Sequence, residues 1–297
     1  MDRLKNKINT AILNLINTIQ YPCMEIIYKR RLFYVYAFCD KILCQTKHNN
    51  LGDDLNIDLI ELISKKILIK PEYAIFRDNR PIYSFIGSIL EYVCNQPYVV
   101  TVWGTGFKYE FSNLLPSQIR KNKYLAVRGP LTRNIIQKAG GECPTIYGDP
   151  GILISRYIKC EKCIKYQYGI IPHKSDMGST ALLSIMERRD VKVISLSKYR
   201  SLFAFIEDVN SCRYILSSSL HGIIISDSYQ VPNLWVKFSL ELDGGDFKFK
   251  DYFMGVKKSV VYLECFEEID FGRAQEQLGR WEAPSIDPAF INSFPLQ

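Results

Sequence analysis

Short apolar strand patterns and amphipathic helix patterns alternate along most of this chain, and this alternation restricts its fold more than any other feature. Strand-like runs rich in Val, Ile, Leu and aromatic residues occur at residues 31–38, 97–106, 123–130, 168–174, 191–196, 213–219 and 232–238. Helical patterns lie between them at 56–69, 131–141, 179–189, 201–212 and 220–230, and a further helix is expected over 259–281. Strands that alternate with helices form parallel sheets covered by helices. The sequence therefore predicts an α/β fold.

A charged stretch at residues 156–166 divides the alternation into two sets. A chain of 297 residues has the length of about two domains. We expect an amphipathic N-terminal helix segment at 1–31, a Rossmann-like domain at 32–160, and a second Rossmann-like domain at 161–297 that includes a C-terminal helix. Two such domains facing each other across a cleft are the simplest assembly.

Composition excludes several classes of protein. With 47% hydrophobic and 23% charged residues, the chain is a globular protein rather than a disordered or coiled-coil one. The net charge of +7 is too small, and too little clustered, to indicate a nucleic-acid partner. Nine cysteines form an odd set that we expect to be reduced in the cytoplasm. The one CxxC pair, Cys160 and Cys163, is half of a zinc site without a second half, so neither a metal nor a cofactor is predicted.

The N-terminal segment has an apolar stripe with helical spacing. The stripe consists of Ile8, Ala11, Ile12, Leu15, Ile16 and Ile19. Six basic residues and two acidic ones lie within residues 1–31. Such a helix suits the interface of an anionic inner membrane leaflet, and it equally suits packing on the body of the protein. The sequence leaves both alternatives open.

Polar residues gather where the predicted strands end, which is where open α/β sheets bind ligands. The most informative of these segments, residues 217–222, reads Ser-Ser-Ser-Leu-His-Gly and leads from a strand into a helix. The amides of a helix N-terminus and nearby hydroxyl groups, here those of Ser218 and Ser219, form an anion pocket. His221 could donate a hydrogen bond or a proton there, or it could be a half-buried structural histidine. His173 follows another strand of the same predicted domain, which favours the functional interpretation.

Other strand ends carry an arginine, aspartates and glycines. Arg128 could bind a carboxylate or phosphate with two hydrogen bonds, or form a surface salt bridge. Asp53 could be a general base or only a helix cap, whereas Asp149, within Asp-Pro-Gly, is expected to shape a turn. Gly104 and Gly106 do not form a dinucleotide fingerprint and could serve a tight turn.

Eight of these segments, in this order, resemble the polysaccharide pyruvyl transferase family. They are NLGDDLN, YSFIGSIL, VWGTGF, AVRGPLT, GDPGILI, GIIPHK, SSSLHGIIISDSYQVP and FKFKDYF, which together span roughly residues 46 to 255. The resemblance implies two Rossmann-like domains with a cleft between them, as in GT-B glycosyltransferases. It also implies transfer of a pyruvyl group from phosphoenolpyruvate to a sugar of a bacterial surface polysaccharide, such as a capsule or exopolysaccharide, to form a cyclic ketal.

Carried over to this chain, the resemblance places Arg128 on the carboxylate or phosphate of the donor. It places His221 near the enol ether or phosphate of the donor and makes Asp53 the acidic residue of the N-terminal domain. Our hypothesis is that His221 protonates the donor and that Asp53 activates a sugar hydroxyl. The expected substrate-binding residues are Arg128, Ser218, Ser219, Leu220, His221, Gly104, Gly106, His173, Lys174 and Lys248. Members of the family often have arginine where this chain has Ser219. Either Lys174 or Lys248 replaces that charge, or the donor is held differently.

Three functions remain open at this stage. The first is a pyruvyl transferase that acts on a lipid-linked oligosaccharide, located in the cytoplasm and peripheral at the inner membrane. The second is a glycosyltransferase that uses a sugar nucleotide on the same two-domain frame. The third is a non-catalytic binding module, against which the grouping of Arg128, His221 and Asp53 argues.

Overall fold

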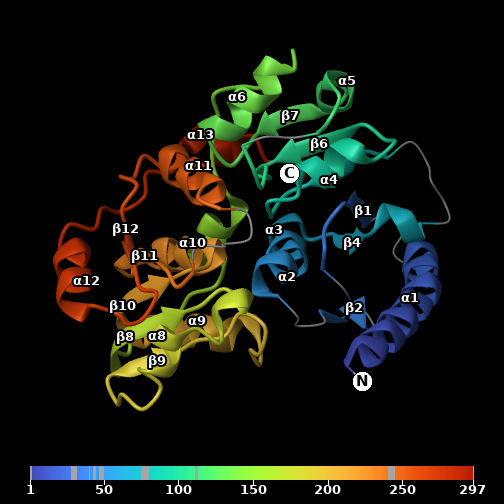
Figure 1. Ribbon diagram of the computed structural model, residues 1–297. Helices are drawn as coiled ribbons and strands as arrows, with labels where there is room; N and C mark the ends of the chain where they lie inside the picture. Colours follow the sequence, from blue (N-terminus) through green and yellow to red (C-terminus); the bar gives the residue numbers. More distant parts are fainter. Residues whose placement is uncertain are drawn as a thin grey trace.

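Two parallel five-stranded sheets form the framework of the protein (Figure 1). The computed structural model describes residues 2–27, 32–39, 41–42, 45–46, 50–74, 80–110, 113–239 and 245–296. The first sheet has the spatial order β4 (Ile67–Ile69), β1 (Leu32–Val35), β5 (Ile82–Ser84), β6 (Val100–Trp103) and β7 (Lys123–Ala126). The second has the order β12 (Tyr262–Glu264), β11 (Asn233–Lys237), β10 (Cys212–Ser217), β8 (Tyr166–Ile171) and β9 (Val191–Val193). The predicted α/β fold with two Rossmann-like halves is confirmed at this level.

Both sheets have the same strand connections. In each sheet the second strand along the chain lies at one side of the first, and the third strand lies at its other side. The strand order therefore reverses between β1 and β5 in one sheet and between β8 and β10 in the other. Open α/β sheets bind ligands beyond the carboxyl ends of the strands at such a reversal. The topology thus marks one candidate position in each half.

Helices connect the strands. The helices of the first half are α1 (Asp2–Ile27), α2 (Leu51–Asp58), α3 (Ile60–Ser64), α4 (Leu90–Asn95), α5 (Pro116–Arg120), α6 (Pro130–Lys138) and α7 (Ile154–Tyr157). Those that follow are α8 (Thr180–Leu183), α9 (Leu202–Asn210), α10 (Leu220–Ser228), α11 (Phe247–Gly255), α12 (Phe271–Leu278) and α13 (Pro288–Asn292). Short 3₁₀ turns lie at η2 (Pro71–Tyr73), η3 (Pro150–Leu153) and η4 (Lys174–Asp176), and β2 (Lys41–Ile42) pairs with β3 (Gln45–Thr46) in a small antiparallel ribbon.

Three predicted helices are wrong in part. The helix predicted over 56–69 ends at Lys65, whose φ of 55° is left-handed, and the chain continues as β4 beside β1. A left-handed residue stops a helix, so the apolar run after it is free to extend. The predicted helix over 259–281 begins instead with β12, which completes the edge of the second sheet, and only α12 is helical. The helix predicted over 179–189 is limited to the single turn of α8.

The two halves share one core. A continuous cluster of buried apolar side chains includes Val35 of β1 and Ile215 of β10, one from each sheet. The chain passes from α7 into β8 through an exposed stretch at 159–165. Backbone and side-chain bonds also cross between the halves, as when Tyr199 donates to Asp54 Oδ2 at 2.6 Å. The surfaces between the sheets are therefore packed interior, except where a cavity opens.

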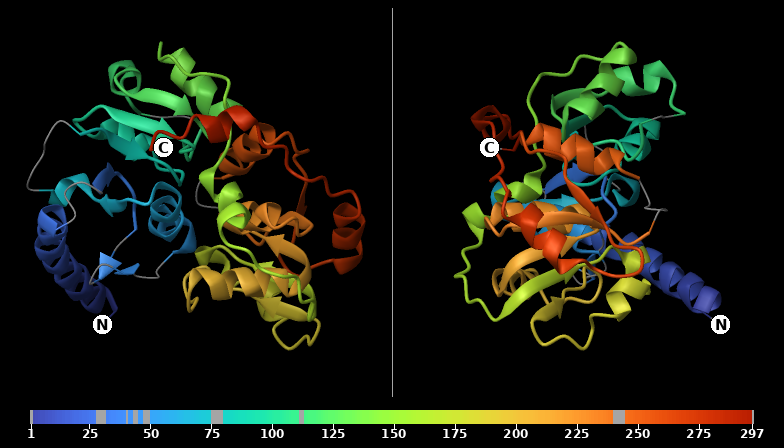
Figure 2. Two further views of the ribbon diagram at one scale, coloured as in Figure 1. Left: turned by 180° about the vertical axis from the view of Figure 1, so that it is seen from behind. Right: turned by 60° about the vertical axis from the view of Figure 1, so that its left-hand side comes forward.

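The end of the chain returns to the first half (Figure 2). In α13 the ring of Phe290 stacks on Trp103 of β6, with centroids 4.3 Å apart and an interplanar angle of 3°. Trp103 Nε1 donates to the carbonyl of Phe290 at 3.0 Å, and both side chains are fully buried. The C-terminal segment is thus part of the core beneath the first sheet.

We expect Phe290→Ala to lower the free energy of unfolding by about 3 kcal/mol, because it empties a fully buried aromatic position. Urea unfolding followed by tryptophan fluorescence would measure the change. Phe203→Ala, at an exposed position of α9, is the matched control and should leave the midpoint nearly unchanged. An unaltered midpoint for Phe290→Ala would contradict the role of α13 in the core.

Candidate functional site

A cavity of about 390 Å³ lies where the carboxyl ends of the two sheets meet. The first half lines it with Phe38 after β1, Asn50 and Asp53 at α2, Gly87, Ser88 and Ile89 after β5, and Lys108 after β6. The second half contributes Pro172, His173, Lys174 and Met177 after β8, Ser195, Leu196 and Ser197 after β9, Ser219, Leu220 and His221 after β10, and Lys248 of α11. The segments after β1, β5, β8 and β10 all reach the wall, so the cavity occupies the strand-order reversals of both sheets.

The charge of the wall favours an anionic ligand. Among the described lining residues, the charged side chains are those of Lys108, Lys174 and Lys248 against one carboxylate, that of Asp53. Lys248 is 7% exposed, so little water screens its ammonium group. The N-terminus of α10, with its partial positive charge, opens on the same cavity. A small molecule with one or two negative charges fits this surface.

The turn from β10 into α10 is held by hydroxyl groups rather than by a side-chain cap. Ser219 is the N-cap of α10 and makes no side-chain capping bond. Its backbone N–H donates to Ser217 Oγ at 3.0 Å, and Ser217 Oγ in turn donates to the carbonyl of Ile171 at 2.8 Å. These bonds tie the ends of β8 and β10 together. They orient Leu220 and His221 towards the cavity.

His221 is clamped between the two halves. A Cβ atom added to Gly52 of α2 would lie 1.9 Å from the imidazole Nδ1, so only glycine leaves room for the ring. Figure 1 shows α2 and α10 facing each other at the centre of the molecule. The Leu-Gly-Asp-Asp segment thus contains a glycine because the histidine of the other half packs directly on it.

The surroundings of His221 favour the neutral form of its imidazole. Burial lowers the pKa of its imidazole to about 3, and the nearby positive charges of Lys248, Arg128 and His173 act in the same direction. An anion bound among these cations would oppose their effect and raise the pKa. The protonation of His221 is therefore coupled to the occupancy of the cavity.

Asp53 lies in the part of the wall that the first half contributes, in the first turn of α2. Its Oδ2 accepts a hydrogen bond from Asn50 Nδ2 at 2.6 Å. A Cβ on Gly87 would lie 4.0 Å from Asp53 Oδ1, which places the carboxylate beside the loop after β5. The aspartate is half-buried and faces the cavity, as a general base requires.

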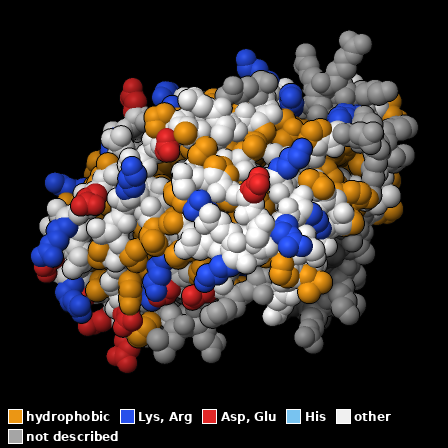
Figure 3. Space-filling model, turned by 90° about the horizontal axis from the view of Figure 1, so that it is seen from above, with side chains coloured by type: hydrophobic (Ala, Val, Ile, Leu, Met, Phe, Trp, Pro, Cys, Tyr) orange, Lys and Arg blue, Asp and Glu red, His pale blue; other side chains and the backbone are white. Residues whose placement is uncertain are grey.

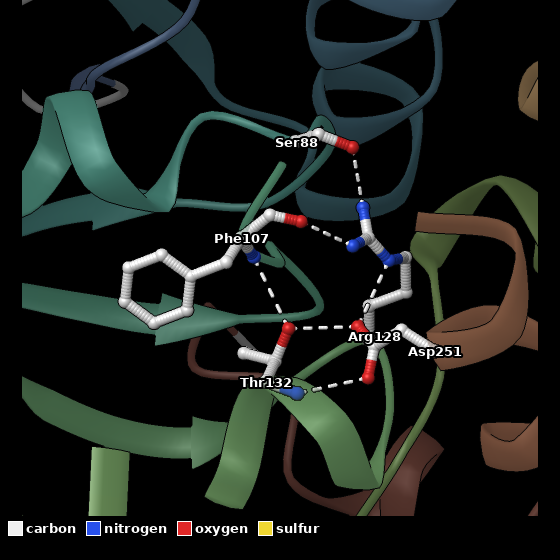
Figure 4. A network of polar contacts seen from close by, with 5 residues as sticks. All are labelled: Ser88, Phe107, Arg128, Thr132 and Asp251. Carbon is white, nitrogen blue, oxygen red and sulfur yellow. Dashed lines mark hydrogen bonds and ion pairs between the residues drawn. The ribbon is translucent and has the colours of Figure 1, made fainter. Parts of the chain in front are cut away.

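Arg128 lies behind the wall of the cavity, fully buried (Figure 4). Its Nε donates to Asp251 Oδ2 at 3.1 Å, Nη2 to the carbonyl of Phe107 at 2.5 Å, and Nη1 to Ser88 Oγ at 2.5 Å. Ser88 itself lines the cavity. The guanidinium therefore positions the loop after β5 and contributes charge to the site, while its direct contact with a ligand stays a prediction.

Three more predicted binding residues lie outside the cavity wall. Ser218 is buried and donates to Asp176 Oδ2 at 2.5 Å. Gly104 has a φ of +96°, and a Cβ there would lie 2.3 Å from Pro150 Cδ. A Cβ on Gly106 would collide with the guanidinium of Arg128. These residues shape the structure around the site.

Asp149 has the structural role predicted for it. Its Oδ1 accepts a hydrogen bond from the N–H of Gly151 at 3.0 Å and so caps η3. Burial raises the pKa of its carboxyl group to about 6. Cys160 and Cys163 are free thiols in the link before β8, where Cys160 is half-buried and Cys163 is exposed.

Sequence reasoning missed Ser88, Lys108 and Gly52 as parts of the site. Ser88 follows β5 and Lys108 follows β6. The rule that ligands bind beyond the carboxyl ends of parallel strands could therefore have included both. The signal for Gly52 was its place between a strand and the acidic residues of α2. Only the packing of the two halves shows that it faces His221.

We expect Gly52→Ala to displace the imidazole of His221, because the new methyl group would overlap the ring. The chain has three histidines, so histidine NMR signals can be assigned by substitution and the shift of the His221 resonances measured. Gly178→Ala is the matched control, since nothing lies within 4 Å of a Cβ there. Unchanged His221 resonances in Gly52→Ala would contradict the close packing.

Comparison with known proteins agrees with this geometry. The family model described as polysaccharide pyruvyl transferase matches residues 49–238, a range that contains Asp53, Arg128 and His221. The chain is also 31% identical over 245 residues to an uncharacterized protein of Acanthamoeba polyphaga mimivirus, an alignment that covers 80% of this chain and 79% of the relative. The resemblance drawn from the sequence motifs is thereby confirmed. The chain belongs to the polysaccharide pyruvyl transferase family.

Proposed function

We propose that this protein transfers a pyruvyl group from phosphoenolpyruvate to two hydroxyl groups of a sugar in a polysaccharide precursor, and forms a cyclic ketal. The observation that carries the proposal is the cavity itself. It brings three lysines, one aspartate and a half-buried histidine together at the carboxyl ends of two parallel sheets. This placement supports a GT-B-like arrangement, in which donor and acceptor meet between two Rossmann-like domains.

The cations of the second half suit the donor. Phosphoenolpyruvate has a phosphate and a carboxylate on adjacent positions of a three-carbon unit. Lys248 and Lys174, together with the N-terminus of α10, offer separate positive groups for the two anions. The buried Lys248 takes the place of the arginine that is often found at the position of Ser219. A volume of about 390 Å³ leaves space for a sugar ring beside the donor.

The reaction requires one acid and one base. The acid gives a proton to the methylene carbon of phosphoenolpyruvate, so that C2 becomes electrophilic. A sugar hydroxyl, whose proton passes to Asp53, attacks C2. The C–O bond to phosphate breaks, and a neighbouring hydroxyl closes the ring. The two hydroxyl groups together release two protons. One makes up for the proton given to the methylene carbon, and the other leaves with inorganic phosphate.

His221 is the proposed acid. Its imidazole is neutral while the cavity is empty, because burial and neighbouring cations hold its pKa near 3. The charges of the bound donor offset those cations, so His221 takes up a proton as the donor binds. The resulting imidazolium then lies next to the carbon that it protonates.

The direct test is product formation. Phosphoenolpyruvate and candidate acceptor sugars are incubated with the protein, and mass spectrometry is used to detect the gain of a ketal-linked pyruvyl group together with release of phosphate. In a second experiment, thermal-shift measurements compare the stabilisation of the protein by phosphoenolpyruvate with that by a panel of nucleotide sugars. Stabilisation by a nucleotide sugar but not by phosphoenolpyruvate would reject the proposed donor.

We expect donor binding to be accompanied by uptake of a proton, because the pKa of His221 rises from its low value in the empty cavity. Calorimetry at pH 7 in two buffers with different ionisation enthalpies measures the number of protons taken up. In His221→Gln the uptake should decrease, and subtraction of the variant removes the titration of the donor itself. Equal uptake by both proteins would contradict the proposed acid.

We expect Lys248→Ala to weaken the binding of phosphoenolpyruvate roughly 10- to 100-fold, the range for loss of a hydrogen bond to a charged group. Lys248→Arg should restore part of the affinity. Lys250→Ala is the control, since this lysine on the same helix is exposed and forms an ion pair with Asp246. Similar dissociation constants for Lys248→Ala and Lys250→Ala would show that Lys248 does not bind the donor.

A further inference from the structure

Helix α1 is attached to the protein by a partly polar face. Asn17, Tyr21, Met24 and Glu25 are buried. The ring of Tyr21 stacks on Tyr73 with centroids 5.5 Å apart. Glu25 Oε1 accepts a hydrogen bond of 2.5 Å from the hydroxyl of Tyr34 in β1. These contacts determine which side of the helix faces the first sheet.

The opposite side of α1 exposes an apolar stripe. Ile12, Leu15, Ile19 and Ile26 are 52, 63, 60 and 66% exposed, and their spacing places them on one face. The sequence left open whether the helix packs on the protein or lies in a membrane interface. It does pack on the protein, but through its buried face and not through this exposed stripe. Figures 1 and 2 show α1 along the outer edge of the first half, away from the second sheet.

The charges of this segment have an unusual distribution. Between Ile8 and Tyr28 the sequence contains a single charged residue, Glu25, and that residue is buried. Three basic residues, Arg3, Lys5 and Lys7, lie in the first turns of α1, and the sequence continues after the helix with Lys-Arg-Arg at 29–31. On the face shown in Figure 3, by contrast, apolar side chains are interspersed with charged ones. The exposed stripe is thus uncharged and bracketed by basic residues.

We propose that α1 lies in the interface of an anionic membrane, with the stripe of Ile12, Leu15, Ile19 and Ile26 inserted among the lipids. A helix of 26 residues extends roughly 39 Å along the surface, and basic residues flank its stripe on both sides in the sequence, as binding to anionic headgroups requires. Among the described residues, no helix has the length and apolar character needed to span a bilayer. The helix is therefore suited to lie along the surface.

The basic residues that flank the stripe also argue against a second copy of this chain as the partner that covers it. In a parallel pair of α1 helices, the residues at 3–7 would face their own copies. In an antiparallel pair they would lie beside the last turns of the other helix, after which the sequence reads Lys-Arg-Arg. Both arrangements bring like charges together, whereas anionic headgroups neutralise both ends.

The test is sedimentation of the full chain with vesicles. One set contains phosphatidylcholine alone, and the other contains phosphatidylcholine with a quarter phosphatidylglycerol. We expect binding to the anionic set that weakens as salt is added. The variant Leu15→Ser/Ile19→Ser should bind about 100-fold more weakly, since each buried side chain contributes roughly tenfold. Leu183→Ser/Met186→Ser, at two other exposed apolar positions, should bind like the unaltered protein.

Several outcomes would overturn the proposal. These are absence of binding to anionic vesicles, full binding by Leu15→Ser/Ile19→Ser, or a dimer in analytical ultracentrifugation that this variant abolishes. Circular dichroism and the melting temperature check that the variant is folded. If it is not, Lys5→Glu/Lys7→Glu replaces it and should bind weakly with little dependence on salt. Because donor binding can be measured without lipid, failure of this test would leave the proposed transferase activity unaffected.

Discussion

The buried carboxylate of Asp251 joins the two halves of this protein at the point where the site is built. It accepts hydrogen bonds from Arg128 Nε, from the N–H of Thr132 at 2.9 Å and from Thr132 Oγ1 at 2.7 Å. Asp251 belongs to α11, whereas Arg128 and Thr132 follow the last strand of the first sheet. A buried ion pair of this kind is costly to break, because the remaining charge has no partner. The contact therefore determines how the second half is placed on the first, and α11 also carries Lys248 into the cavity.

The same pairing explains the electrostatics of the site. Arg128 is neutralised by Asp251 on one side and holds Ser88 and Phe107 on the other. Burial is the main cause of the lowered pKa of His221, and the charges of Lys248 and Arg128 act in the same direction. Among the described residues, the cavity thus groups three lysines around a histidine whose surroundings favour its neutral form. Binding of an anion there balances charges that the fold has already brought together, so little rearrangement is needed.

Much of this arrangement could be predicted from the sequence. The rule that polar residues after parallel strands gather at one edge placed Asp53, His173 and His221 correctly at the cavity. The rule could not distinguish a side chain that faces the cavity from one behind its wall. Four residues expected to bind the ligand therefore lie outside the wall in the structure, namely Arg128, Ser218, Gly104 and Gly106. That distinction depends on contacts between distant segments, such as that of Arg128 with Asp251. Similarly, β4 and β12 were missed because short apolar runs fit a helix or a strand, and pairing with a neighbour decides between them.

The stacking of Phe290 on Trp103 has a consequence for synthesis of the chain. Trp103 is in the fourth strand of the first sheet, and its partner residue lies 187 positions later. The first half therefore cannot complete its core until residue 290 has left the ribosome. During translation the first sheet must wait while the indole of Trp103 lacks its stacking partner. A chain that stops before residue 288 would contain every strand of the first sheet without the helix that completes its core.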